Sequence, residues 1–455
     1  MRTRYLIILL FCFSWQFCEA QNFKLMRYDE DYSHLKDSAR TFYNTLKFIP
    51  ISASGSTFLS LGGEARLEVD RVQNEDWGAR GIGRNIFMLQ RYNLHADLHI
   101  GKKVRFFSQL RSGLENGRKN GPRPIDEDQL NIQNLFVDVT AIKTSDKLLN
   151  LRLGRQELQY GSGRLIDVRE GPNLRNYFDG VKLAYSSPKL TIDGLLMADG
   201  KTRPGVMDNL RARKPNLWGI YSTISPLKFL NVDLYYLGSR RDQFLYDEGF
   251  RPERRHTFGT RLWKNNKGLI YNFEIGVQRG EFGVDRIKAW GGSSELGYRF
   301  GSVKGFPTLK LRSDFISGDD EKGDGKLGTF SPLYPNGGYF GMNPQAGPAN
   351  LLSLHPSLGW SPLTDIVVTM ELVMAWRESA NDGIYRPDGS LNLSSSGSEE
   401  KYIGTTYLTS LSWGVNRYLN VNVGVQYFRT GSFLNDVIPG HKDGFFATTV
   451  VGFKF

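Results

Sequence analysis

The chain has 455 residues, of which 40% are hydrophobic. After residue 21 no apolar run approaches the roughly 20 residues that a membrane-spanning helix needs, which excludes a helical membrane protein. Fifty glycines, 29 phenylalanines and 21 tyrosines favour many strands and turns, and they exclude the aromatic-poor composition of a disordered chain. The formal net charge of +11 is compatible with a protein that handles anions.

The first 20 residues have the three parts of a secretory signal. Arg2 and Arg4 precede an apolar run over residues 5–13, and Ala20 offers a small residue for cleavage. We therefore predict a signal peptide at 1–20, with an uncleaved N-terminal anchor as the alternative. Both cysteines of the chain lie in this segment, so the exported protein would have no disulfide and no thiolate metal ligand.

Residues 21–56 are polar and mixed, with a possible short helix at 35–46. We interpret them as an extension that lies in the periplasm or in the lumen of the domain that follows. From 57 to 455, apolar and polar side chains alternate with a period of two, in segments of roughly ten residues. Strands of soluble proteins are usually about 5–6 residues long, so the length of these segments favours membrane-spanning strands.

The predicted fold class is all-β: a closed antiparallel transmembrane β-barrel of about 18 strands over residues 57–455, in a bacterial outer membrane. Closure allows every backbone N–H and C=O group to be paired inside lipid. The chain ends on an aromatic residue, Phe455, as outer-membrane barrels commonly do. Turn-rich segments that are predicted to be extracellular loops lie at 73–84, 115–129, 200–215, 317–350 and 378–400.

The alternation stops in one place that is rich in charge and glycine. Residues 154–158 are Gly-Arg-Gln-Glu-Leu and residues 160–165 are Tyr-Gly-Ser-Gly-Arg-Leu. Asn173 follows, and a strand pattern resumes at 178–181 with Phe-Asp-Gly-Val. Five arginines lie between the flanking strands and within the interruption: Arg152, Arg155, Arg164, Arg169 and Arg175.

This run resembles the central motif of the alginate export porin family. The resemblance implies an outer-membrane barrel with a narrow, electropositive pore that passes an anionic polysaccharide, and with acidic residues that pair the pore arginines. Within the motif it assigns pore roles to Arg155, Arg164, Arg175 and Asp179. Outside 153–183 the resemblance matches no residue to a role, so the substrate itself stays open.

Arginine suits such a pore because the guanidinium group makes planar, bidentate contacts with carboxylates, and rings of cationic side chains select anions. The predicted substrate-pathway and selectivity residues are Arg152, Arg155, Arg164, Arg169, Arg175, Asp179, Arg66, Arg91, Arg105, Arg111, Arg312 and Arg377. Acidic partners expected on the same face are Glu64, Glu68, Asp97, Asp314 and Glu371. The alternative is a charged ladder that only braces and hydrates the wall.

The sequence thus predicts a passive outer-membrane channel, a porin and not an enzyme, that passes an anionic polysaccharide or another anionic solute. Expected partners are outer-membrane lipid, an anionic glycan or small anion, and periplasmic export or uptake proteins. Nucleic acid, cofactors and metals are not expected, although the acidic loop at 318–325 could hold calcium. Two alternatives stay open: a lipase or protease on a barrel, and a structural barrel with an occluded lumen.

Overall fold

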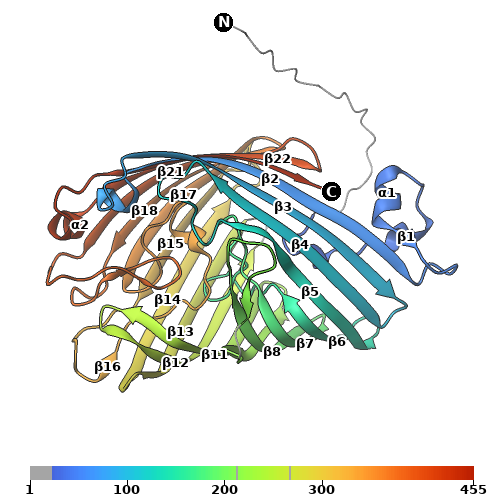
Figure 1. The fold of residues 1–455 in the computed structure, drawn as a ribbon, viewed down its shortest axis with the longest axis horizontal. Helices are drawn as coiled ribbons and strands as arrows, with labels where there is room; N and C mark the ends of the chain where they lie inside the picture. Colours follow the sequence, from blue (N-terminus) through green and yellow to red (C-terminus); the bar gives the residue numbers. More distant parts are fainter. Residues whose placement is uncertain (1–22, 212–213, 266–267) are drawn as a thin grey trace, which may run out of the picture.

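The computed structural model describes residues 23–211, 214–265 and 268–455; the predicted signal peptide lies outside them. In this part of the chain, 18 antiparallel strands form a closed barrel (Figure 1). The strands are β2 Phe58–Gln73, β3 Arg84–Ile100, β4 Val104–Asn116, β5 Asp128–Lys143, β6 Leu148–Gln156, β7 Phe178–Ser187, β8 Leu190–Lys201, β10 Leu217–Leu227, β11 Leu230–Tyr246, β12 Gly249–Asn265, β13 Leu269–Phe282, β14 Asp285–Arg299, β15 Thr308–Ile316, β17 Leu351–Leu363, β18 Ile366–Trp376, β21 Tyr402–Gly414, β22 Leu419–Thr430 and β23 Gly444–Lys454. β2 pairs with β23, which closes the cylinder and confirms the predicted fold class.

The other described elements are short. They are η1 Arg27–Asp29, η2 Ser33–Asp37, α1 Phe42–Lys47, β1 Ile49–Pro50, η3 Glu75–Gly78, β9 Leu210–Arg211, β16 Lys326–Leu327, η4 Gly337–Phe340, β19 Ile384–Tyr385, β20 Leu391–Leu393 and α2 Ser432–Val437. The helix expected at 35–46 is divided into η2 and α1, because Thr41 caps a new helix by accepting a hydrogen bond from the N–H of Asn44 at 3.1 Å. No described helix is long and apolar enough to cross a bilayer.

The barrel wall has an apolar outer face and a polar inner face. On β3, Leu94 is 61% exposed, whereas its neighbours Asn93 and His95 are 4% and 6% exposed. This difference follows from the pleat of a strand, which points successive side chains to opposite sides. Lipid therefore meets the aliphatic and aromatic side chains, and the polar side chains meet one another inside the barrel.

The two ends of the barrel differ in the length of their connections. Short turns such as 101–103 and 188–189 lie at one end, and the loops 157–177, 317–350 and 377–401 leave the other end. Residues 23–48, here named the N-terminal segment, lie at the short-turn end, on the right of Figure 1 with the C terminus.

The N-terminal segment is attached to the inner wall. The guanidinium of Arg27 donates to the backbone oxygens of Phe455 at 2.8 Å and of Gly63 at 3.0 Å. The ring of Tyr28 packs edge-on against Phe107 and Phe136, with centroids 5.7 and 5.2 Å away. Because all three rings are buried, the segment fills part of the barrel interior at this end.

Candidate functional site

The loop between β6 and β7, residues 157–177, crosses the interior of the barrel and is named the crossing loop. At one end it contacts β2 and β3, where Arg66 and Arg91 hold Glu170. At the other it contacts β13 and β15, where Ser162 donates to Glu274 at 3.0 Å and Arg164 pairs with Asp314. β2 and β13 are the first and eleventh strands in the barrel order, so the loop spans nearly opposite walls.

The sequence of the crossing loop explains its path. Gly163 has a φ of +78°, and its N–H donates to the oxygen of Tyr160 at 2.9 Å, which makes a tight turn. A Cβ at Gly163 would lie 2.5 Å from a carboxylate oxygen of Asp167. Beyond the turn, Ile166 is fully buried and bridges to Tyr334. This bridge fastens the crossing loop to the β15–β17 loop, residues 317–350.

Three arginines converge on Glu170 of the crossing loop. Arg91 and Arg175 both donate to the side chain of Glu170. Arg66 donates to the backbone oxygens of Glu170 and Gly171, at 3.0 and 3.2 Å. The set Arg66, Arg91, Arg175 and Glu170 is named the Glu170 cluster. Enclosure in the barrel alone would raise the pKa of the Glu170 carboxyl, but the charges of Arg91 and Arg175 hold that pKa below its usual range.

Each arginine of the Glu170 cluster also has a carboxylate on its other side. Arg91 donates to Glu64 at 2.7 and 3.1 Å, Arg175 lies 3.3 Å from Glu157, and Arg66 pairs with Glu68. The side chains of Glu64 and Glu157 are only 5% and 0% exposed. These buried carboxylates hold the guanidinium groups of Arg91 and Arg175 beside Glu170.

Neighbouring strands carry further arginines in bidentate pairs. Arg105 binds Asp97 through two contacts of 2.7 Å, Arg152 binds Asp138 at 2.7 and 2.8 Å, and Arg155 binds Asp179 through two contacts of 2.9 Å. Such fork-to-fork pairs fix both position and orientation. On β4, Arg111 donates to Asp128 at 2.8 Å. It also donates to the backbone oxygen of Arg175 at 3.0 Å, and so helps to position this member of the Glu170 cluster.

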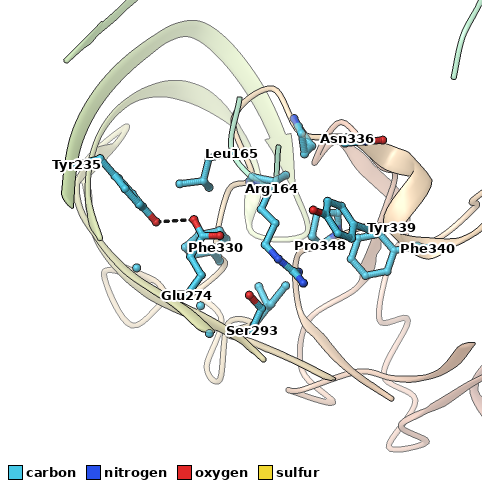
Figure 2. A pocket seen from close by; sticks show the side chains of 16 residues that line it. Arg164, Leu165, Tyr235, Glu274, Ser293, Phe330, Asn336, Tyr339, Phe340 and Pro348 are labelled. Carbon is cyan, nitrogen blue, oxygen red and sulfur yellow. Dashed lines mark hydrogen bonds between the residues drawn. The ribbon is translucent and has the colours of Figure 1, made fainter. Parts of the chain in front are cut away.

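The far end of the crossing loop forms a pocket with the β15–β17 loop (Figure 2). The ring of Tyr339 lies close to two guanidinium groups, 4.5 Å from that of Arg164 and 5.0 Å from that of Arg312. Arg312 also donates to Glu371 at 3.0 Å. Leu165, Phe330, Phe340 and Pro348 make most of the remaining lining apolar.

Each of the five carboxylates expected as partners, Glu64, Glu68, Asp97, Asp314 and Glu371, is in an ion pair with a predicted arginine. Arg169 differs, since no carboxylate of the described residues lies within 4.0 Å of its guanidinium. Its φ is +58°, and burial lowers the pKa of its side chain.

The expectation that Arg377 faces the lumen needs correction. Its side chain is fully buried and donates to the backbone oxygens of Ala380, Asp382, Ser398 and Glu400. Arg377 follows the last residue of β18, so the alternation of that strand no longer sets its direction. It braces the β18–β21 loop, residues 377–401, and cannot meet a passing solute.

Sequence reasoning missed the contribution of the N-terminal segment. The hydroxyl of Tyr28 donates to the backbone oxygen of Glu157 at 2.8 Å, and Arg175 donates to that of Leu25 at 3.0 Å. The guanidinium of Arg152 lies 4.4 Å from the Tyr28 ring. The only signal was the aromatic and acidic run at 28–32, which by itself indicates no partner.

The described residues contain no group of three or more histidine, cysteine, aspartate or glutamate side chains placed to hold a metal ion. In the acidic loop at 318–325, Asp324 pairs with Lys326, and Lys322 lies 2.9 Å from Asp247.

Comparisons with known proteins match residues 57–446 to the alginate export family. None of the curated proteins compared with the sequence matches it. The fold is similar to that of Pseudomonas aeruginosa OpdO, with 13% identity, 87% of this chain and 97% of that chain covered, and a TM-score of 0.59. It is also similar to Pseudomonas aeruginosa OccK2 (OpdF) in complex with glucuronate (12% identity, 87% and 98% covered, TM-score 0.57) and to Acinetobacter baumannii OccAB1 (10%, 87% and 97%, 0.58).

The family match spans nearly the whole barrel, including the crossing loop with its arginines. The solved structures add an independent likeness in fold over 87% of the chain. The chain therefore belongs to the alginate export family, and it is an outer-membrane β-barrel porin, a channel rather than an enzyme.

Proposed function

We propose that this channel passes an anionic solute, an acidic glycan or another carboxylate, along the arginines of its inner face. The observation that carries the proposal is the Glu170 cluster, in which two guanidinium groups bind one carboxylate and a third binds the backbone oxygen of the same residue. A site that holds the carboxylate of a glutamate offers the same donors to the carboxylate of a uronate sugar.

The paired arginines beside the cluster support a conduction pathway for the anion and not one tight binding site. Arg105, Arg152 and Arg155 lie on β4 and β6, and each is paired with a carboxylate of the wall. Ion pairs of this kind lower the net field, so a passing anion is attracted without being held permanently. Conduction requires this balance between entry and release.

The likeness to a solved structure in complex with glucuronate supports an acidic sugar as the first solute to test. Partners other than outer-membrane lipid and the solute are part of the same proposal, namely periplasmic proteins that deliver or accept the solute at the short-turn end. The direction of transport is left open by the site, because a passive pathway serves both directions.

Reconstitution in a planar lipid bilayer tests the proposal. We expect a measurable conductance, a reversal potential of the sign for anion preference in a salt gradient, and block by glucuronate but not by glucose. A preference for cations would contradict the proposal. Absence of conductance would favour the structural barrel with an occluded lumen.

A further inference from the structure

We propose that Glu170 is a built-in stand-in for the substrate: its carboxylate occupies an arginine site that a carboxylate of the passing solute takes over by exchange. This inference rests on the proposed function, and it goes further by assigning one exchange site, its internal competitor and the ligand class that wins the competition.

The accessibility of the cluster points to exchange. The side chain of Glu170 is 37% exposed, whereas those of Arg91 and Arg175 are each 3% exposed. The two arginines are therefore almost inaccessible while Glu170 is in place, and exchange requires that its departure uncovers them. Their other partners, Glu64 on β2 and Glu157 at the start of the crossing loop, are buried, so both guanidinium groups would keep their orientation.

The arginines have donors to spare. Within the described part of the chain, Nη1 of Arg91, Nη2 of Arg175 and Nε of Arg66 are buried nitrogen atoms without a hydrogen-bond partner. A buried donor without a partner costs free energy, and a larger or doubly charged ligand could satisfy donors that one glutamate leaves unpaired. The cluster is thus incompletely saturated by its own chain.

Residues 169–171 are named the tip of the crossing loop, and the backbone on both sides of the tip is fixed by hydrogen bonds. On one side, Asp167 donates its N–H to the oxygen of Tyr334 at 2.8 Å. On the other, the side-chain amide of Asn173 donates to the backbone oxygens of Gln90 and Asp126 at 3.0 and 2.9 Å. Residues 169–171 between these anchors are held mainly by arginine side chains.

The tip also has strain and space. Arg169 has a φ of +58°, a conformation that costs about 1 kcal/mol or more for a residue other than glycine. A Cβ added to Gly171 would meet no atom within 4 Å, so open space adjoins the tip. A displaced Glu170 and an incoming ligand group both have room there.

Exchange favours solutes with several carboxylates. The tethered Glu170 competes at the high effective concentration of an intramolecular group, and a single free carboxylate must overcome that advantage. A chain of uronate units brings its own high local concentration, because neighbouring carboxylates rebind when one leaves. We therefore assign the cluster to linear polycarboxylates in preference to isolated monocarboxylates.

The test is block of single-channel current by glucuronate and by an oligouronate, in the wild type, in Glu170→Gln and in Glu295→Gln. Glu295 is a matched control, since it is an inner-wall glutamate near Lys310, 3.9 Å away, and far from the cluster. We expect Glu170→Gln to lower the half-blocking concentration of glucuronate about tenfold, which corresponds to one charge-assisted hydrogen bond. Glu295→Gln should change it by less than about twofold.

The same measurement contains the outcomes that overturn the inference. An unchanged or higher half-blocking concentration in Glu170→Gln would show that Glu170 only braces the crossing loop. An equal decrease of the half-blocking concentration in Glu295→Gln would show that Glu170 acts only through its negative charge. Glu170→Asp keeps the charge but shortens the side chain, so a smaller decrease of the half-blocking concentration is expected. An unchanged half-blocking concentration in this variant would also count against exchange. If the wild type lacks both anion preference and block, the proposed function fails; if only the Glu170 variants fail to respond, the exchange site alone fails.

Discussion

Two carboxylate sites on the inner wall have the same chemistry but different architecture. Asp233 is 1% exposed and accepts from the side chains of Tyr221, Thr223, Arg261 and Trp263 at 2.7 to 3.0 Å. These residues are named the Asp233 cluster. Its acceptor atoms are fully used and closed to solvent, whereas the Glu170 cluster keeps an exposed carboxylate and unused donors. The comparison separates a site that braces the wall from one that can exchange its ligand.

The difference arises from where each carboxylate is attached. Asp233 lies on β11, directly across from Thr223 on β10 and Arg261 on β12, so the register of the sheet fixes all the partners. Glu170 lies on a loop and is held by side chains of two strands and of its own loop. A carboxylate on a regular strand is positioned by the backbone ladder, and one on a loop by the ion pairs themselves.

The largest effect is expected from breaking the bracing site. Asp233→Ala leaves the guanidinium of Arg261 without a carboxylate partner and three other donors without an acceptor, which should lower the free energy of unfolding by about 3–5 kcal/mol. Urea unfolding in detergent micelles, followed by tryptophan fluorescence, measures the loss. The variant that still inserts should keep the anion preference of the wild type. A loss below about 1 kcal/mol would remove the distinction between the clusters.

The second effect concerns the exchange site. Arg91→Gln combined with Arg175→Gln removes the two charges that hold the Glu170 carboxylate, and we expect glucuronate to bind about tenfold more weakly, or about 1.4 kcal/mol. Half-blocking concentrations in single-channel recordings give this number. Arg261→Gln removes the one arginine charge of the Asp233 cluster, and it should reduce stability while leaving the block unaltered. Equal loss of block in both variants would show a diffuse field and no local site.

The barrel could be predicted from the sequence because one rule, the alternation of apolar and polar side chains, acts along every strand. The same rule assigned Arg91 and Arg152 to the inner face, where they contact carboxylates. It could not predict that Arg164 meets Asp314, 150 positions away, because that contact depends on the path of an irregular loop. It also failed at Arg377, which lies just beyond the strand whose period was extrapolated.

A smaller effect is expected at the contact between the N-terminal segment and the crossing loop. Tyr28→Phe removes the hydrogen bond to the backbone of Glu157 but keeps the ring packing on Phe107 and Phe136. The expected cost is about 1 kcal/mol, or about fivefold faster amide exchange over residues 23–32 if that segment opens locally. Unchanged exchange would indicate that the ring alone holds the segment.

The smallest effect is expected from pH at the contact between the β15–β17 and β18–β21 loops. Burial raises the pKa of Asp382 to about 6 and, with the nearby charge of Asp382, raises that of Asp319 to about 7, from 3.8 in the unfolded chain. A carboxyl with a raised pKa stabilises the folded form at low pH, and this stabilisation is lost as pH rises from about 4 to about 7. The loop contact should therefore loosen over that range.

The loosening should stay small, because the side-chain amide of Asn350 donates to three backbone oxygens of the β18–β21 loop at 2.9 to 3.0 Å, and these bonds do not titrate. Amide exchange over 317–330 at pH 5 and pH 8, taken relative to the exchange rate of an unfolded chain at each pH, measures it, and Asp319→Asn should reduce the difference. The pKa of Glu170 is lowered and not raised, so its carboxylate stays ionised from pH 5 to pH 8. Glucuronate block should therefore not change with pH in parallel with amide exchange in the two loops. A block that changes in parallel with loop exchange would instead place the two loops, and not the Glu170 cluster, on the path of the solute.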